Sequence, residues 1–344
     1  MSNGRKCTAA VSFNGQNVTG MVGDYLESIS YEDVAKDRSD ALTIRLANID
    51  KKWLNEWYPT KGDSMRCAFT FTDWNKEGDN FTVDCGKFVL DEISFSGSPS
   101  SATFTGLALP ANASFNTKLR NKVWNKITIE KIAATIGRRY RMTLQYDAPS
   151  VSITTLEQSD EDDCSFLYSL CKEYNLGMKV YDNKLVIYDP GKMEQKTPVA
   201  TLTPQSFIDG AWEFVDSLDG TYNGARIAYK TSKKGSKTKS MYIGTVKETD
   251  ENARTLRVSK TANNKADAKF QATAQINASN EEATKLSGTI WPDGNICAGA
   301  TVSVTGFGVP DGKYFVEQCT IQLEPGGVTM NVVMHKCVKR IRRV

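Results

Sequence analysis

Residues 158–189 read QSDEDDCSFLYSLCKEYNLGMKVYDNKLVIYD and carry the clearest local pattern in this chain of 344 residues. Ser159 is a suitable helix N-cap, and the acidic run 160–163 places negative charge on a first helical turn, where the helix dipole favours it. The apolar residues that follow at helical spacing are Phe166, Leu167, Leu170, Cys171 and Tyr174. Asn175 and Gly177 are suited to ending this helix.

A tight hairpin is predicted directly after the helix. Its two strands are residues 178–181 and 184–188, and the turn between them is Asp182-Asn183. The acidic run 160–163 has a second interpretation, as a metal site. It lacks the alternating oxygen ligands, the glycine and the distal glutamate of a calcium loop. We therefore expect helix capping and no metal.

Composition and charge argue for an ordinary soluble protein. Lysine and arginine number 43 and aspartate and glutamate 40, so the net charge of +3 does not predict a nucleic-acid binder. The first residues lead into no apolar run, so no secretory signal peptide is expected. No apolar stretch reaches the ~20 residues that span a bilayer, so no membrane segment is expected. The chain is expected to be made and folded in the cytoplasm.

The residues that usually carry catalysis or bind metals are sparse. The eight cysteines form no Cys-x-x-Cys pair, so buried thiols are expected rather than disulfides or a zinc site. His335 is the only histidine, and its place in an alternating strand near the chain end predicts an exposed or half-buried strand residue. A carboxylate pair for glycoside hydrolysis depends on distance in space and stays open. We predict that the chain is not an enzyme and needs no cofactor.

The first part of the chain, residues 1–112, is predicted to be β. Leu42, Ile44 and Leu46 alternate with polar residues, as in a half-buried strand. The other strands expected here are 10–13, which leads into the turn Asn14-Gly15, 65–72, 81–85, 88–95 and 102–109. Several short strands at such spacing predict a small barrel or sandwich.

The middle part, residues 113–196, is predicted to be α+β and the last part, residues 197–344, β again. A short helix is expected around the apolar residues 129–136 because their spacing is helical. A second helix is expected at 265–275, extending toward 285, because the stretch is rich in alanine. The strands expected in the last part are 199–202, 225–229, 241–244, 255–258, 289–291, 301–304, 314–323 and 328–334. The two β parts could be distant structural duplicates, although no short repeat is visible.

Three stretches in matching order resemble the phage late-control D family, the baseplate hub proteins of contractile tails and phage-tail-like particles. The first is residues 158–189. The second is Gly299, Val302, Val304, Gly306-Phe307-Gly308, Asp311-Gly312 and Tyr314-Phe315-Val316. The third is Pro59, Lys61, Gly62 and Asp63 before the strand 65–72, with Gly86-Lys87-Phe88 after it. Family members often have a histidine after the Tyr-Phe-Val strand, whereas this chain has Glu317-Gln318-Cys319-Thr320.

The resemblance implies a fold and a function. It implies two tube-like β-barrel domains, 1–112 and 197–344, that flank the α+β domain 113–196. A homotrimeric ring of such subunits has near-sixfold symmetry and adapts the hexameric tail tube to a trimeric spike. The tail tube protein, a spike protein and other baseplate proteins are then partners, and DNA passes through the central channel without sequence-specific binding. The expected location is the baseplate of a virion or particle assembled in the host cytoplasm. The chain shows no spike or cell-wall-cutting segment, so a separate spike is expected.

Two groups of residues are candidates for protein interfaces. Trp53, Trp57 and Tyr58 are possible aromatic anchors, and their alternative role is to fill the first barrel's core. The C-terminal segment is a basic tail that could dock on an acidic partner, touch DNA or merely aid solubility. Its candidate residues are Lys339, Arg340, Arg342 and Arg343. The alternative function for the whole chain is a carbohydrate-binding or adhesive β module with an aromatic surface platform.

Overall fold

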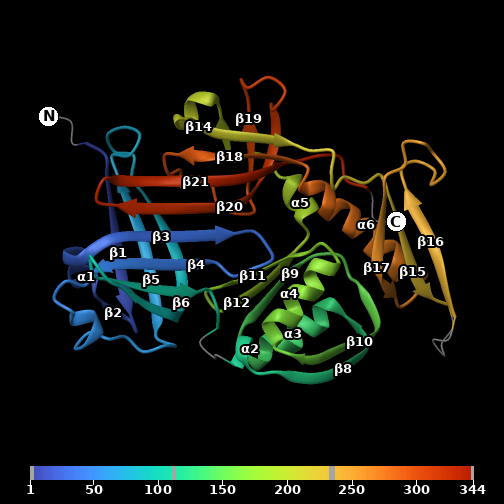
Figure 1. Cartoon of the computed structure of the whole chain (residues 1–344), viewed down its shortest axis with the longest axis horizontal. Helices are drawn as coiled ribbons and strands as arrows, with labels where there is room; N and C mark the ends of the chain where they lie inside the picture. Colours follow the sequence, from blue (N-terminus) through green and yellow to red (C-terminus); the bar gives the residue numbers. More distant parts are fainter. Residues whose placement is uncertain (1–3, 111–113, 232–236, 342–344) are drawn as a thin grey trace.

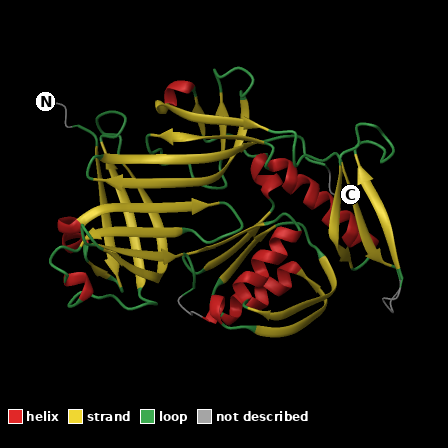
Figure 2. Ribbon diagram, viewed as in Figure 1, coloured by secondary structure: helices red, strands yellow, loops and turns green. Residues whose placement is uncertain are grey.

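The computed structural model describes residues 4–110, 114–231 and 237–341. Strands make up about half of the described chain and helices a smaller share; the longer helices lie in the middle part and beside it, and short ones lie at the left and the top of the molecule (Figure 2). The predicted class, mainly β with a smaller α+β part, is confirmed.

The first part forms a strand-rich unit at the left of Figure 1. Its elements are β1 Lys6–Phe13, β2 Gln16–Asn17, α1 Thr19–Tyr25, β3 Leu26–Val34, β4 Ala41–Ala47, η1 Lys52–Leu54, β5 Ser64–Thr72, β6 Phe81–Ser96 and β7 Ser101–Leu107. The alternating strand predicted at Leu42, Ile44 and Leu46 is confirmed, and all three side chains are fully buried. Two strands predicted on either side of Gly86 form the single strand β6, which accommodates the glycine at a φ of 87°.

The middle part combines four helices with two small sheets. Its elements are α2 Ser114–Thr117, β8 Arg120–Thr128, α3 Ile129–Arg139, β9 Thr143–Asp147, β10 Ser152–Glu161, α4 Asp163–Glu173, β11 Gly177–Tyr181, β12 Lys184–Tyr188 and α5 Pro190–Glu194. The predicted apolar stripe of α4 is buried in this part's own core. The predicted hairpin is also confirmed, and its turn residues Asp182 and Asn183 both have positive φ.

The predicted start of α4 is wrong by three residues. Ser159 lies in β10, and the N-cap is Asp162, whose carboxylate accepts a hydrogen bond of 2.9 Å from the Ser165 amide. The acidic run is split because Asp163 is fully buried and forms ion pairs with Arg120 and Arg139. Among the described residues, no group of three or more His, Cys, Asp or Glu side chains is arranged to hold a metal ion.

The last part contributes strands to the large sheet and a separate helix-backed sheet. Its elements are β13 Ala200–Leu202, η2 Pro204–Ser206, β14 Phe207–Asp216, β15 Gly224–Lys230, β16 Thr238–Gly244, β17 Thr255–Ala262, α6 Lys265–Glu281, β18 Thr284–Ile290, β19 Thr301–Val304, β20 Gly312–Glu324 and β21 Gly327–Lys336. The helix predicted at 265–275 is confirmed and extends to Glu281. It packs on β15, β16 and β17 at the right of Figure 1. No described helix is long and apolar enough to cross a membrane.

Strands from the two ends of the chain share one large sheet. Its order is β14-β18-β21-β20-β3-β4-β7-β6-β5-β1-β2, with β19 on β20 and β13 on β19. The junction is an antiparallel pairing of β20 with β3, and one hydrophobic core takes residues from both sides of it. The division at residues 112 and 196 stays a prediction.

The strand order of the first part recurs in the last part. The first part runs β3-β4-β7-β6-β5-β1 and the last part runs β14-β18-β21-β20-β19-β13. In chain order the two sets also correspond, with β15, β16, β17 and α6 inserted between β14 and β18. The first four pairings are antiparallel in both sets, whereas β1 pairs antiparallel with β5 and β13 pairs parallel with β19. The two β parts therefore share one strand order and differ only in the direction of the last pairing, as distant duplicates would.

Candidate assembly surfaces and the buried ion network

His335 lies at the centre of a buried ion network. Only 1% of the residue is exposed, so the predicted exposed or half-buried position is wrong. Its Nδ1 lies 2.9 Å from Glu317 Oε1 and its Nε2 lies 2.9 Å from Glu194 Oε1. The glutamates come from β20 and α5, and this long-range pairing is the reason that a lone histidine is buried.

Three further cations and a third carboxylate extend the network. Arg340 pairs with Glu194 and lies 2.7 Å from Glu281, which also pairs with Lys36. Lys285 Nζ lies 3.1 Å from Glu317, one of the two glutamates that contact His335. The network thereby joins the end of β3, the middle part and the last part of the chain.

The network holds its members in their charged forms. Burial opposes the charge of His335, but hydrogen bonds to Glu194 and Glu317 outweigh it and raise the pKa of the imidazole to about 9. Burial likewise opposes the charge of Glu281, but Lys36 and other nearby cations lower the pKa of its carboxyl to about 2. A histidine with both ring nitrogens engaged and its proton retained at neutral pH acts as a fixed cation, not as a general base.

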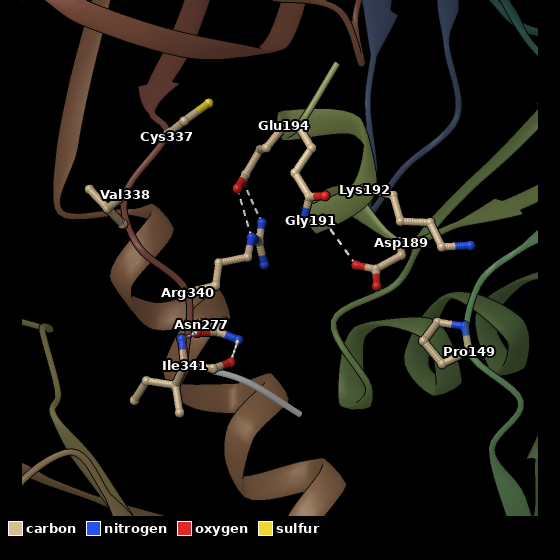
Figure 3. Close-up of a pocket in the computed structure, with 11 residues that line it drawn as sticks. Pro149, Asp189, Gly191, Lys192, Glu194, Asn277, Cys337, Val338, Arg340 and Ile341 are labelled. Carbon is tan, nitrogen blue, oxygen red and sulfur yellow. Dashed lines mark hydrogen bonds and ion pairs between the residues drawn. The ribbon is translucent and has the colours of Figure 1, made fainter. Parts of the chain in front are cut away.

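A groove of about 570 Å³ lies beside this network, between α5, α6 and the C-terminal segment (Figure 3). Arg340 reaches across it toward Glu194. Asn277 on α6 holds Ile341 through two hydrogen bonds, one of 3.0 Å to its carbonyl oxygen and one of 2.9 Å from its amide. The chain up to Ile341 is therefore fixed to α6.

The predicted basic tail is only partly a tail. Arg340 is mostly buried and its charge is matched by two glutamates, so its side chain is engaged within the chain, and its part in an interface stays a prediction. Lys339 is exposed. Arg342 and Arg343 lie outside the described residues.

The three aromatic candidates differ in burial. Trp53 is 6% exposed and packs edge-on against Trp57 and Phe104 in the core, so its assignment as a surface anchor is wrong. Trp57 is half-buried, with Lys52 Nζ 4.8 Å from its ring centroid. Tyr58 is 53% exposed and stacks on Phe95 of β6.

Sequence reasoning missed a second buried ion cluster at the border of the middle part. Lys179 of β11 forms an ion pair with Asp33 of β3 and lies 3.2 Å from Asp40. Asp33 also accepts a hydrogen bond of 2.8 Å from the Ala298 amide. Burial raises the pKa of the Asp40 carboxyl to about 6, although Lys179 opposes this effect. The available signal was a lysine in an otherwise apolar strand, which requires a partner when buried.

Two curated proteins are similar to this chain. Both bear the name probable baseplate hub protein: that of Escherichia phage 186 is 24% identical over 218 residues, and that of Escherichia phage P2 is 26% identical over 198 residues. The matches cover 62% and 55% of this chain, and 54% and 48% of the relatives. The chain thus spans about half the length of the curated relatives it matches. No known family profile matches it.

Solved structures with the same fold include several tail proteins. The 43 kDa tail protein of prophage MuSo2 from Shewanella oneidensis has a TM-score of 0.69 at 12% identity, covering 96% of this chain and 98% of that one. A tail protein from Neisseria meningitidis has a TM-score of 0.68 at 14% identity, covering 96% and 97%. An E. coli type VI secretion component has a TM-score of 0.56 at 13% identity, covering 97% and 80%.

These comparisons confirm the resemblance to baseplate hub and tail proteins. The relatives are named as tail and baseplate hub proteins, which agrees with the predicted structural rather than enzymatic role.

Proposed function

We propose that this protein is the hub of a baseplate, where three copies form a ring that joins a hexameric tail tube to a trimeric spike. Function then resides in subunit interfaces and a central channel. The similarity to named baseplate hub proteins supports the structural role and the location in a virion or particle baseplate.

The repeated strand order carries this proposal. A subunit with two β parts of one strand order presents two similar surfaces, so three subunits present six. Head-to-tail contacts between subunits close into a ring when the rotations between neighbouring subunits add up to a full turn. A ring of three such subunits has near-sixfold symmetry on the face formed by the six similar surfaces and threefold symmetry on the other face. Closure of each β part into a tube-like barrel, with the middle domain outside the ring, belongs to the same proposal.

The partners follow from this geometry. A tail tube protein and other baseplate proteins bind the ring, a separate spike protein binds its threefold face, and DNA passes through the channel without sequence-specific contacts. Assembly takes place in the host cytoplasm. Tyr58, Trp57 and Lys339 are the described candidates for these contacts, because each keeps exposed surface.

The observed aromatic side chains favour the hub over the sugar-binding alternative. The exposed Tyr58, Trp212 and Trp291 each contact a different neighbour: Phe95, Phe307 and Arg5. Among the described residues, no ring contact joins two of these three into the platform that a sugar requires.

The test is the mass of the purified full-length protein in solution. Light scattering is measured on the protein alone and after co-expression with a candidate spike from a neighbouring gene. A complex with three copies of each supports the proposal. A monomer that binds neither the spike nor any neighbouring tail protein refutes it.

A further inference from the structure

The junction between the two β parts shows how the edge strand of one part, β3, pairs with a strand of the other part, β20. Residues 29–34 of β3 pair antiparallel with residues 318–323 of β20, so the edge of one sheet continues into the next. Core-facing side chains on both strands are buried at this seam. Their exposed fractions are 1% for Ile29, 7% for Tyr31, 3% for Cys319 and 4% for Ile321.

The strand β6 of the first part corresponds to β20 in detail. In β6, the Gly62 amide donates to the Leu90 carbonyl oxygen at 2.8 Å; in β20, the Gly299 amide donates to the Val316 carbonyl oxygen at 2.9 Å. Both glycines have positive φ, 92° and 89°. Both hairpins also shift register directly after the acceptor residue. Leu90 is therefore the counterpart of Val316.

From this anchor, residues 92–96 of β6 correspond to residues 318–322 of β20. In β20 this stretch pairs with β3 on the side away from β21. In β6, the pairing with β5 ends at Val89, and beyond it only β7 pairs with the strand among the described residues. The edge that β20 uses at the internal seam is thus free in β6.

The strand β14 corresponds in the same way to β3. Phe207 lies opposite Ile290 as Leu26 lies opposite Leu46, at the start of the matching pair of strands. The register can be followed from β14 through β18 to β21, and from β3 through β4 to β7. When β21 is aligned with β7, residues 212–216 of β14 become the counterparts of residues 29–33 of β3. Among the described strands, only β18 pairs with β14, so its outer edge is free as well.

The two free edges are less buried than their counterparts in the seam. Trp212 is 41% exposed, whereas Ile29 is 1% exposed. Phe214 and Phe95 are half-buried and reach the edge of the large core. In Figure 1, β14 crosses the top of the molecule and β6 lies at the lower left, so one chain does not bring these edges together.

We infer that β14 of one copy pairs antiparallel with residues 92–96 of β6 in the next copy and reproduces the β3–β20 seam between chains. This inference rests on the proposed ring and names its contact surface and register. The seam places Phe214 opposite Phe95, Val215 opposite Ser94 and Asp216 opposite Ile93. Because the contact joins two different edges, it is head-to-tail and can close a ring. Unpaired backbone amides and carbonyls along both edges make them templates for such pairing.

The backbone geometry selects one pair for cross-linking. At the seam the Ala35 amide donates a hydrogen bond to the Glu317 carbonyl oxygen. Every second residue before Ala35 therefore also directs its backbone amide and carbonyl toward β20. Glu32, three residues before Ala35, directs its backbone groups away from β20. Glu32 and Thr320 therefore form a pair without mutual hydrogen bonds, where side chains approach closely. Their counterparts between chains are Val215 and Ser94, both exposed in the single chain. Cysteines at such positions fall within disulfide reach.

The experiment co-expresses two full-length chains with different tags, one carrying Ser94→Cys and the other Val215→Cys, together with the spike candidate. A mild oxidant that takes up the two thiol hydrogens is added, and the fraction of mixed-tag dimer is read on a non-reducing gel. The matched control pairs Val215→Cys with Ser96→Cys instead of Ser94→Cys. Ser96 lies two residues away from the position that the inferred register places opposite Val215. Each single variant alone reports linkage through the native cysteines, and its melting temperature shows that it folds.

The inference expects at least a tenfold excess of mixed-tag dimer over the out-of-register control. A ring of correct mass with no such excess overturns the inferred register and leaves the ring intact. An excess without a trimeric ring supports the edge pairing and removes the proposed hub. Monomers without linkage overturn both.

Discussion

Replacing the buried His335 by glutamine tests the ion network at its centre. The variant His335→Gln keeps a polar side chain of similar size but removes the cation held between Glu194 and Glu317. The two carboxylates then lose a shared partner inside the protein, which is costly because buried charges depend on pairing. We expect a clear loss of stability at neutral and mildly acidic pH.

The pKa of His335 sets the size and the pH range of this loss. It is about 9 in the folded protein, against 6.5 as the ordinary value. At about 1.4 kcal/mol per pKa unit, the difference corresponds to about 3 kcal/mol of stabilisation. A raised folded-state pKa gives this stabilisation in full below pH 6.5, and it is lost as the pH rises through 9. The deficit of the variant should therefore be largest near pH 6 and shrink toward pH 9.5.

The assay is urea denaturation of both proteins at half-unit steps from pH 6 to pH 9.5. His335 is the only histidine, and all other titrating groups, including the cysteines, are the same in both proteins. The difference between the two free energies of unfolding therefore reports the titration of the His335 imidazole. Asn331→Gln, at an exposed position of the same strand, is the matched control and should follow the wild type. A constant difference across this pH range would refute the assigned protonation.

Three further outcomes are expected. Glu281→Gln should destabilise the protein by about 3 kcal/mol at pH 7, because nearby cations lower the pKa of the folded-state carboxyl to about 2. This deficit should shrink as the pH falls from 4.5 toward 2, and urea denaturation at several acidic pH values measures it. A deficit that stays constant over this range would contradict the prediction. Tyr58→Ala should change the stability of the single chain by less than about 1 kcal/mol but weaken ring formation, as sedimentation would measure; unchanged assembly would remove Tyr58 from the interface. Gly177→Ala should lower the melting temperature by several degrees, because its Cβ would lie 2.3 Å from the Tyr188 ring, whereas Gly326→Ala has open space and should not; equal melting would refute the packing argument.

Local patterns predicted most of the individual elements. The stripe of α4 and the hairpin after it follow from residues within about 30 positions of one another, so the sequence contains their whole cause. The strand β3 was missed because Glu27, Glu32 and Asp33 conceal its alternation. Asp33 is buried there only because Lys179, 146 residues away, neutralises it.

Local patterns and composition suffice for the mainly β class, the core stripe of α4 and the scarcity of catalytic side chains. The burial of His335 and Arg340 and the pairing of β3 with β20 depend instead on contacts between distant segments of the folded chain. Glu194 and Arg340 are 146 residues apart, and β3 and β20 lie at opposite ends of the chain. Spacing along the chain carries no information on such partners, since charge pairing and strand register depend on which surfaces folding brings together.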